Sequence, residues 1–211
     1  MREIVKDFEV KIEQKEILRL LGHTSKSESI KESTIITIQE MIKISAKLIK
    51  PKGIYAIKGS EELPEECLFD SAEKVALCIC TIGEGLEKKV KSLSRKGELG
   101  KAVILDAIGS VAAESAAEYT NQVIKDKARK ENLYCGTRFS PGYGGWKLEE
   151  QKLFFDLLPA DKIGVSLNKS FMMIPRKSVS FAVNLSKKPF KNKKTPCEIC
   201  GLKECRFKNI G

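Results

Sequence analysis

The sequence predicts an α+β protein in which one mixed, mainly antiparallel sheet packs against long helices. Two long segments carry apolar residues at the helical period, and the last third of the chain holds short strand-like runs separated by turns. The 211 residues are 42% hydrophobic and 31% charged, which suffices for a substantial core. We expect one domain over residues 1–186, followed by a basic linker and a cysteine-rich tail over residues 187–211.

The N-terminal part of the chain alternates strand and helix patterns. Residues 8–12 alternate like a half-buried strand, and residues 13–21 predict a short helix. Apolar residues at helical spacing between 27 and 49 predict a long amphipathic helix that ends before Pro51. Residues 54–57 are typical of another strand.

A buried strand is predicted over residues 74–82, because apolar side chains occupy both of its faces. A strand of this kind lies in the middle of a sheet. Cys78 and Cys80 are therefore expected to be core thiols. A helix over residues 86–93 follows the strand.

A second long helix is predicted over residues 102–131. Its middle is rich in alanine, which predicts close packing of another part of the backbone against it. Glu114 and Glu118 are four residues apart and lie on one face of this helix. The two carboxylates are either an exposed edge or a paired site.

After a glycine-rich loop, the chain predicts a helix over residues 148–158 and three short strands, over 163–167, 171–174 and 178–185. The turn before the last strand contains a proline. These strands account for the antiparallel part of the expected sheet, because short connections join antiparallel neighbours.

The glycine-rich loop from Arg138 to Trp146 suits the binding of a small molecule. Its glycines and proline allow backbone N–H and C=O groups to approach a ligand closely. Arg138 offers a planar cation for a carboxylate, and Tyr143 and Trp146 offer flat apolar faces. The alternative is an ordinary surface loop with incidental aromatic residues.

Composition excludes several classes of protein. No apolar run is long enough to span a bilayer and the N-terminus is too charged for a secretory signal, so we expect a cytoplasmic protein without a membrane partner. The formal charge is +10, but five lysines lie between positions 187 and 194. That segment is either a solvated linker or a docking segment for an acidic protein or nucleic acid.

The seven cysteines predict reduced thiols or metal ligands rather than a disulfide framework. Cys197, Cys200 and Cys205 have a spacing that places three thiolates around one metal. The candidates for a fourth ligand are Cys67, Cys135 and His23. Zinc and an iron–sulfur cluster with one open iron are both compatible with this spacing, and a reactive or disordered thiol tail is the alternative.

Three blocks of the sequence together resemble the reactivation domain of cobalamin-dependent methionine synthase in its stand-alone form. They are the alanine-rich acidic stretch 107–119, the Arg-x-x-Pro-Gly-Tyr block 138–143, and the block 169–180, which resembles Glu-Ser-Phe-x-Met-x-Pro-x-x-Ser-Val-Ser. Lys169 replaces the usual acid of the third block. After Tyr143 the multidomain enzymes continue Pro-Ala-Cys-Pro, whereas this chain has the Gly-x-Trp form of separate-chain relatives.

The resemblance implies that the chain binds S-adenosylmethionine and presents its methyl group to cob(II)alamin held by a partner methionine synthase. A flavodoxin or comparable donor would supply the electron. It implies no catalytic acid or base, and it leaves open whether the isolated chain is an enzyme. The implied ligand contacts are Arg138 for the carboxylate, Glu114 and more weakly Asp106 for the ammonium, backbone groups of Ser140 and Gly142, and Tyr143 beside the methyl-bearing end.

Two alternatives compete with this interpretation. One is a reductive activator of a different corrinoid methyltransferase, since the motifs do not identify the partner. The other is a basic nucleic-acid-binding protein with a small zinc element, based on the pI of about 9.2. We place nucleic acid last, because apart from two phenylalanines the basic residues are not interleaved with aromatic residues.

Overall fold

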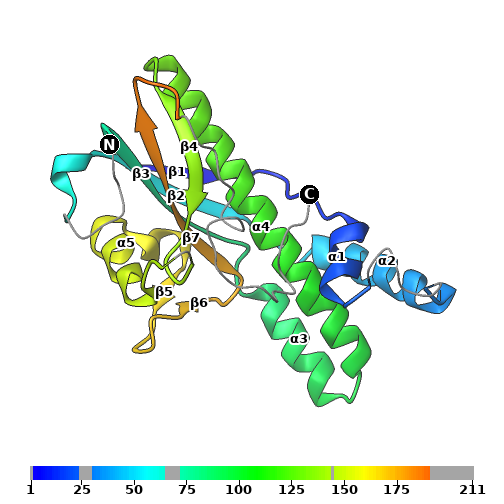
Figure 1. Cartoon of the computed structure of the whole chain (residues 1–211). Helices are drawn as coiled ribbons and strands as arrows, with labels where there is room; N and C mark the ends of the chain where they lie inside the picture. The colour runs from blue at the N-terminus through cyan, green and yellow to red at the C-terminus, as the bar shows by residue number, and fades with distance from the viewer. Residues whose placement is uncertain (1, 24–29, 65–71, 144, 191–211) are drawn as a thin grey trace.

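The computed structural model describes residues 2–23, 30–64, 72–143 and 145–190. They form a five-stranded antiparallel sheet with the long helix α4 against one face and α5 against the other (Figure 1). The helices are α1 (Gln14–Leu20), α2 (Glu32–Ala46), α3 (Gly85–Arg95), α4 (Leu99–Lys130) and α5 (Gln151–Leu157). The strands are β1 (Arg2–Lys6), β2 (Lys52–Gly59), β3 (Lys74–Thr81), β4 (Tyr134–Phe139), β5 (Ser166–Leu167), β6 (Met173–Ile174) and β7 (Ser178–Ser186). The predicted α+β class is confirmed.

The sheet has the order β1-β2-β3-β7-β4, with β3 at its centre. Side chains of β3 alternate between two apolar cores, so that Cys78 and Cys80 face α4 while Leu77 and Ile79 face α5. All four side chains are fully buried. The prediction of a central strand with core thiols is therefore confirmed.

Small residues let α4 lie close to the sheet. Ala112, Ala116 and Ala117 are fully buried on the face of α4 that packs there. At Gly53 of β2 the approach is so tight that an added Cβ would lie 2.7 Å from the Thr120 hydroxyl oxygen. This explains the alanine-rich pattern of the sequence, because larger side chains would hold the helix away from the strands.

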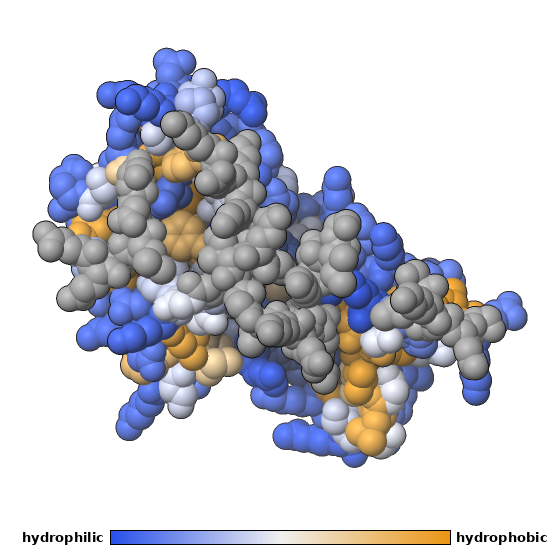
Figure 2. All heavy atoms as spheres, viewed as in Figure 1, coloured by the Kyte–Doolittle hydropathy of each residue, from blue (hydrophilic) through white to orange (hydrophobic). Residues whose placement is uncertain are grey.

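The first half of α4 extends past the sheet and pairs with α3 in a helical hairpin (Figure 1). Leu86 and Leu93 of α3 are buried against α4 in the same core as the alanines. Figure 2 shows hydrophobic side chains beside hydrophilic ones at the end of this hairpin that lies away from the sheet. Helices α1 and α2 pack on another side of α4.

The strand predicted over residues 8–12 is wrong. The N-terminal strand is β1, which ends before Asp7, whose φ of 56° breaks the extended backbone. Residues 8–12 cross α4 instead, where Phe8 stacks on Tyr119 with ring centroids 4.3 Å apart and the Lys11 backbone N–H donates to Ser115 Oγ at 2.7 Å. The alternating pattern therefore arises from packing on a helix.

Three further differences concern the second half of the chain. The edge strand β4 was not predicted, since half-exposed residues with an irregular register give no clear alternation. The strand predicted over 163–167 is largely wrong, because Ala160–Ile163 forms a 3-10 helix and β5 covers two residues only. The strand predicted over 171–174 is only half right, because Phe171 has a φ of 55° and β6 covers two residues, which pair with β5 in a separate two-stranded sheet. The other predicted helices and strands are confirmed with shifted ends, and residues 27–29 of the second predicted helix lie outside the described residues.

None of the helices formed by the described residues combines the length and hydrophobicity that a bilayer-spanning segment needs.

The close contact at Gly53 predicts that Gly53→Ala destabilises the protein by about 1 to 3 kcal/mol, the usual cost of overpacking. Thr120 cannot easily yield, because its side chain is β-branched and its hydroxyl donates to the Ala116 carbonyl oxygen at 2.9 Å. Urea unfolding monitored by circular dichroism measures the change. The matched control is Gly100→Ala in the first turn of α4, where an added Cβ meets no atom within 4 Å. Equal stability of the Gly53→Ala protein and the parent would contradict the packing described.

Cys78 should resist alkylation in the folded protein. Burial, and then the neighbouring Cys80, raise the pKa of the Cys78 thiol well above its usual range, and the thiolate is the reactive form. Incubation with iodoacetamide followed by peptide mass spectrometry should leave Cys78 unlabelled, whereas the same treatment in urea labels it. Equal labelling rates in the two conditions would show that the thiol is accessible.

Candidate functional site

Arg138 lies on the edge strand β4 and points to the face of the sheet that α4 covers. It pairs in register with Val183, and its guanidinium carbon lies 5.2 Å from the centre of the Phe181 ring. Both neighbours belong to the core beneath α4. Only 20% of the Arg138 side chain is exposed. The aromatic ring and the strand therefore hold the guanidinium between sheet and helix.

Two carboxylates of α4 face this guanidinium. Arg138 donates from Nη2 to Glu114 Oε1, and Nε lies 4.0 Å from Glu118 Oε2. Glu118 also accepts from Lys125 at 3.2 Å. The structure thus brings together two predicted site residues, Arg138 and Glu114. It adds Glu118, which the four-residue spacing had placed on the same helix face without assigning it to the site.

One nitrogen of Arg138 has capacity for a further acceptor. Within the described residues, the buried Nη1 atom has no hydrogen-bond partner. A buried guanidinium nitrogen left unpaired is costly, and carboxylates are its best acceptors because they match its planar fork. Glu114 is 61% exposed, so it can rotate away or bind a second cation. The arrangement can therefore hold a group that carries both a negative and a positive charge.

The predicted ligand loop begins directly after Arg138 and wraps around the edge of the sheet. Because side chains alternate along β4, Phe139 points to the opposite face, where it packs against Trp146 with centroids 5.2 Å apart. Trp146 is only 4% exposed and also packs on Phe154. The prediction that Trp146 offers its ring to a ligand is wrong, since this ring anchors the loop in the core.

Backbone hydrogen bonds fix the conformation of the loop. The Gly142 N–H donates to the Trp146 carbonyl oxygen at 2.7 Å, and the Tyr143 N–H donates to the Ser140 carbonyl oxygen at 3.2 Å. Gly142 has a φ of 89°, which only glycine adopts readily. Tyr143 is 62% exposed. The loop thus keeps Ser140, Gly142 and Tyr143 near the end of β4, two to five residues beyond Arg138.

Asp106 lies in a different charged cluster. Its carboxylate is 3.0 Å from Lys177 Nζ, which also donates to Ser110 Oγ at 2.9 Å. The backbone N–H of Lys177 donates to Glu87 of α3 at 2.8 Å. Eight residues of helix place Asp106 about 12 Å along the axis from Glu114. The structure therefore does not bring Asp106 to Arg138, and it gives Asp106 the role of fixing the start of β7 against α3 and α4.

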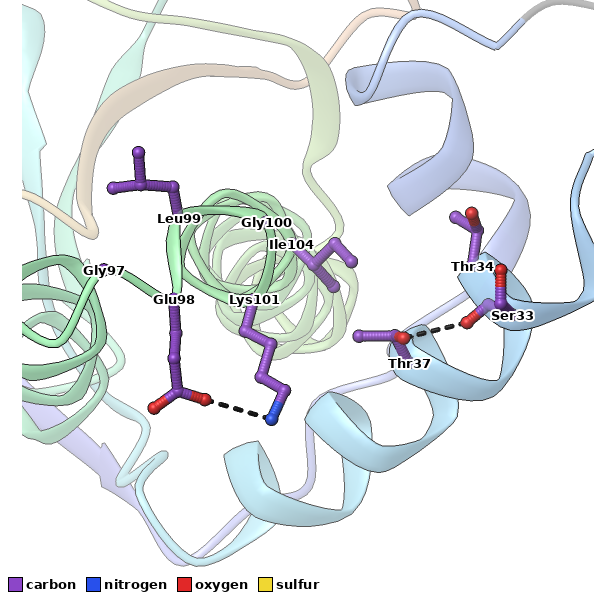
Figure 3. A pocket seen from close by; sticks show the side chains of 9 residues that line it. All are labelled: Ser33, Thr34, Thr37, Gly97, Glu98, Leu99, Gly100, Lys101 and Ile104. Carbon is purple, nitrogen blue, oxygen red and sulfur yellow. Dashed lines mark hydrogen bonds and ion pairs between the residues drawn. The ribbon is translucent and has the colours of Figure 1, made fainter.

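Two surface hollows lie away from these residues. One, of about 550 Å³, lies between the starts of α2 and α4 and is lined among others by Thr34, Thr37 and Ile104 (Figure 3). The other, of about 430 Å³, includes Tyr55 and Lys127. The first is wide open, and its one lysine already pairs with Glu98. We therefore base the site on the pair of the mostly buried Arg138 and the exposed Glu114, whose geometry specifies a ligand more closely.

The predicted metal ligands Cys197, Cys200 and Cys205 lie outside the described residues, as does Cys67. Of the two other candidates, Cys135 is half-buried on β4, where burial raises the pKa of its thiol. Among the described residues, no group of three His, Cys, Asp or Glu side chains is arranged to hold a metal ion. The metal site stays a prediction.

The sequence model of the family described as vitamin B12 dependent methionine synthase, activation domain, matches residues 64–189. This range covers more than half of the chain and includes α4, β4 and the glycine-rich loop. The chain therefore belongs to this activation-domain family. A search of curated proteins gave no match.

The fold agrees with this assignment. A crystal structure described as the MetH reactivation domain bound to AdoHcy superposes with a TM-score of 0.65 at 15% sequence identity. The similarity covers 87% of this chain and 78% of that one. At this identity it is the fold that is shared, and a coverage of 87% means that it includes part of the N-terminal region that lies before the family match.

The cluster at Lys177 predicts that Asp106→Asn lowers stability by about 1 kcal/mol, because the mostly buried Lys177 loses a charged partner. In a Lys177→Met background the same substitution should have little further effect. Urea unfolding of the four proteins of this double-mutant cycle measures both changes. Additive effects of the two substitutions would show that Asp106 and Lys177 do not interact.

Proposed function

We propose that this chain binds S-adenosylmethionine and supports the reductive methylation of cob(II)alamin held by a partner methionine synthase. Membership of the activation-domain family supports a role in reactivation. The relative of similar fold is described as bound to AdoHcy, the product of S-adenosylmethionine after methyl transfer. The observation that carries the proposal is the charge pair of Arg138 and Glu114 beside the glycine-rich loop.

The pair suits the amino-acid end of S-adenosylmethionine, which bears one carboxylate and one ammonium group. The carboxylate would bind Arg138, including its unpartnered Nη1, while the ammonium would take the place of Arg138 as the partner of Glu114 or Glu118. Backbone groups of Ser140 and Gly142 and the exposed ring of Tyr143 would contact the rest of the molecule. Asp106 is a weaker candidate, because it already pairs with Lys177.

The reaction itself needs positioning rather than proton transfer. One electron from a flavodoxin-like donor reduces cob(II)alamin to cob(I)alamin. The cobalt electron pair then attacks the methyl carbon, the carbon–sulfur bond breaks, and methylcobalamin and S-adenosylhomocysteine result. No proton moves, so the chain requires no general acid or base. The role of the chain is to hold the sulfonium group so that sulfur, methyl carbon and cobalt lie in line.

The partner is proposed from the family. A cobalamin-binding methionine synthase without its own activation domain is the first candidate, and another corrinoid methyltransferase is the second. The residues around Arg138 fit S-adenosylmethionine in either case, so binding of the methyl donor does not separate them. Methylation assayed with each purified corrinoid protein does.

The tail cysteines add a second proposal, an iron–sulfur cluster or zinc site at Cys197, Cys200 and Cys205. Its support is the cysteine spacing, and the redox step favours the cluster. Anaerobic purification with metal analysis and visible absorption separates the two. Stoichiometric zinc without a charge-transfer band would exclude an electron-transfer role for the tail.

Isothermal titration with S-adenosylmethionine should give an affinity that Arg138→Ala lowers about 10- to 100-fold, the usual effect of losing a charge-assisted hydrogen bond of about 1.5 to 3 kcal/mol. Glu114→Gln should lower it about tenfold, because the amide keeps the shape but loses the attraction for an ammonium group.

The matched controls for this titration are Arg129→Ala and Asp161→Asn. Arg129 is an exposed arginine near the end of α4, and Asp161 is an exposed acid in the 3-10 helix before β5. Both controls should bind like the parent protein. If Arg138→Ala and Glu114→Gln also bind like the parent, the site is assigned to the wrong residues. If the parent protein does not bind S-adenosylmethionine, the proposed function is wrong.

A further inference from the structure

The α3–α4 hairpin exposes two apolar side chains on one face of α4. Leu99 is 62% exposed and Val103 is 58% exposed, and four residues separate them, so they are neighbours on the helix surface. Leu99 points away from α2, whereas Ile104 points towards it (Figure 3). We call Leu99 and Val103 the apolar ridge. Large apolar side chains exposed next to each other are typical of a contact surface.

The apolar ridge is continuous with the proposed ligand site. Leu99, Val103, Asp106, Ser110 and Glu114 follow one another along α4 at intervals of three or four residues. Such intervals follow one stripe of an α-helix, which over this distance is about 22 Å long. A protein that reaches the methyl donor near Glu114 from outside can therefore lie along α4 and contact the ridge.

Helix α3 carries cations along its edge beside this stripe. Glu87 of α3 accepts a hydrogen bond from the backbone N–H of Lys177, and the Lys177 side chain pairs with Asp106 of the stripe. The side of α3 that carries Glu87 therefore borders the stripe. Lys91 and Arg95 follow Glu87 at four and eight residues and so lie on the same side, and both are exposed.

The charge of these cations is not neutralised by the hairpin itself. The carboxylates of this part of the hairpin are already engaged: Glu84 pairs with Lys88, Glu98 with Lys101 and Asp106 with Lys177, and Glu87 accepts from the Lys177 backbone N–H. No ion pair of Lys91 or Arg95 occurs within the described part of the chain. A cluster of unneutralised cations beside apolar side chains fits an acidic protein surface with an apolar centre.

We propose that the apolar ridge, together with Lys91 and Arg95, is the surface on which the cobalamin-holding partner docks through an acidic patch. This proposal rests on the proposed function, and it adds which face of the molecule the partner covers. Docking there places the partner along the α4 stripe whose far end is the Arg138–Glu114 pair. The cations attract the partner over a distance, and the ridge supplies the contact that excludes water.

The test uses the full chain and cobalamin-loaded methionine synthase that lacks an activation domain. Leu99→Ser combined with Val103→Ser, and separately Lys91→Glu combined with Arg95→Glu, should each raise the Kd for this partner at least tenfold. The association rate of the parent protein should fall as salt concentration rises, and the charge-reversed protein should lose most of this dependence. Affinity for S-adenosylmethionine should stay unchanged in both variants.

Matched controls come from other faces of the molecule. Ile36→Ser removes an apolar side chain of α2 that is 50% exposed, and Lys152→Glu combined with Lys162→Glu reverses two exposed lysines on the α5 side of the sheet. Both controls should bind the partner like the parent protein. Far-ultraviolet circular dichroism and thermal unfolding verify that every variant is folded.

The outcomes separate this proposal from the one on which it rests. If the parent protein binds S-adenosylmethionine and supports methylation, but the ridge and cation variants bind the partner as tightly as the parent, the docking surface is wrong and the function stands. If the controls weaken binding as much as the variants, the attraction is unspecific and the docking surface is also wrong. If the parent protein neither binds S-adenosylmethionine nor supports methylation, both proposals fail. If the parent protein binds anionic lipid vesicles or nucleic acid through this surface and does not bind the partner, the proposed docking surface is wrong.

Discussion

The candidate site depends on the close packing of α4 on the sheet. Alanines at 112, 116 and 117 and the glycine at 53 bring the helix so near to the strands that carboxylates on its side reach the edge strand. Glu114 and Glu118 then meet Arg138, which the Phe181 ring supports from below. With bulkier residues at the contact the helix would move outwards, and the charges on the two elements would separate by the width of a side chain.

Neighbouring side chains at the end of β4 enter both hydrophobic cores. Arg138 lies under α4, its neighbour Phe139 lies in the core beneath α5, and the loop that follows is anchored by Trp146 in that second core. The position of the loop relative to Arg138 therefore depends on both hydrophobic cores. A loop whose described residues are held by backbone hydrogen bonds and by Trp146, beside a mostly buried cation, is a suitable frame for a small ligand, because little conformational entropy is lost when the ligand binds.

Outside the site, the hairpin of α3 and α4 carries the surface that we propose for docking of the partner. Its inner side is apolar and buried through Leu86 and Leu93, while its outer side combines exposed apolar residues with cations. One helix, α4, thus forms the core contact, the acidic side of the candidate site and the exposed ridge. This arrangement couples the place where a partner could dock to the place where a methyl donor could bind, without any separate connecting element.

The sequence by itself determined the fold class, the central strand β3, both long helices and the family, because these features leave local periodicity and short motifs. It also placed Glu114 and Glu118 on one helix face and Arg138 at the start of the glycine-rich loop. Only the tertiary structure decided that Glu118 joins the charge pair, that Asp106 belongs to Lys177, that Trp146 is a core residue, and that residues 8–12 cross a helix. The physical reason is that these partners lie between 8 and about 110 residues apart in the chain, so that packing, which no local pattern records, brings them together.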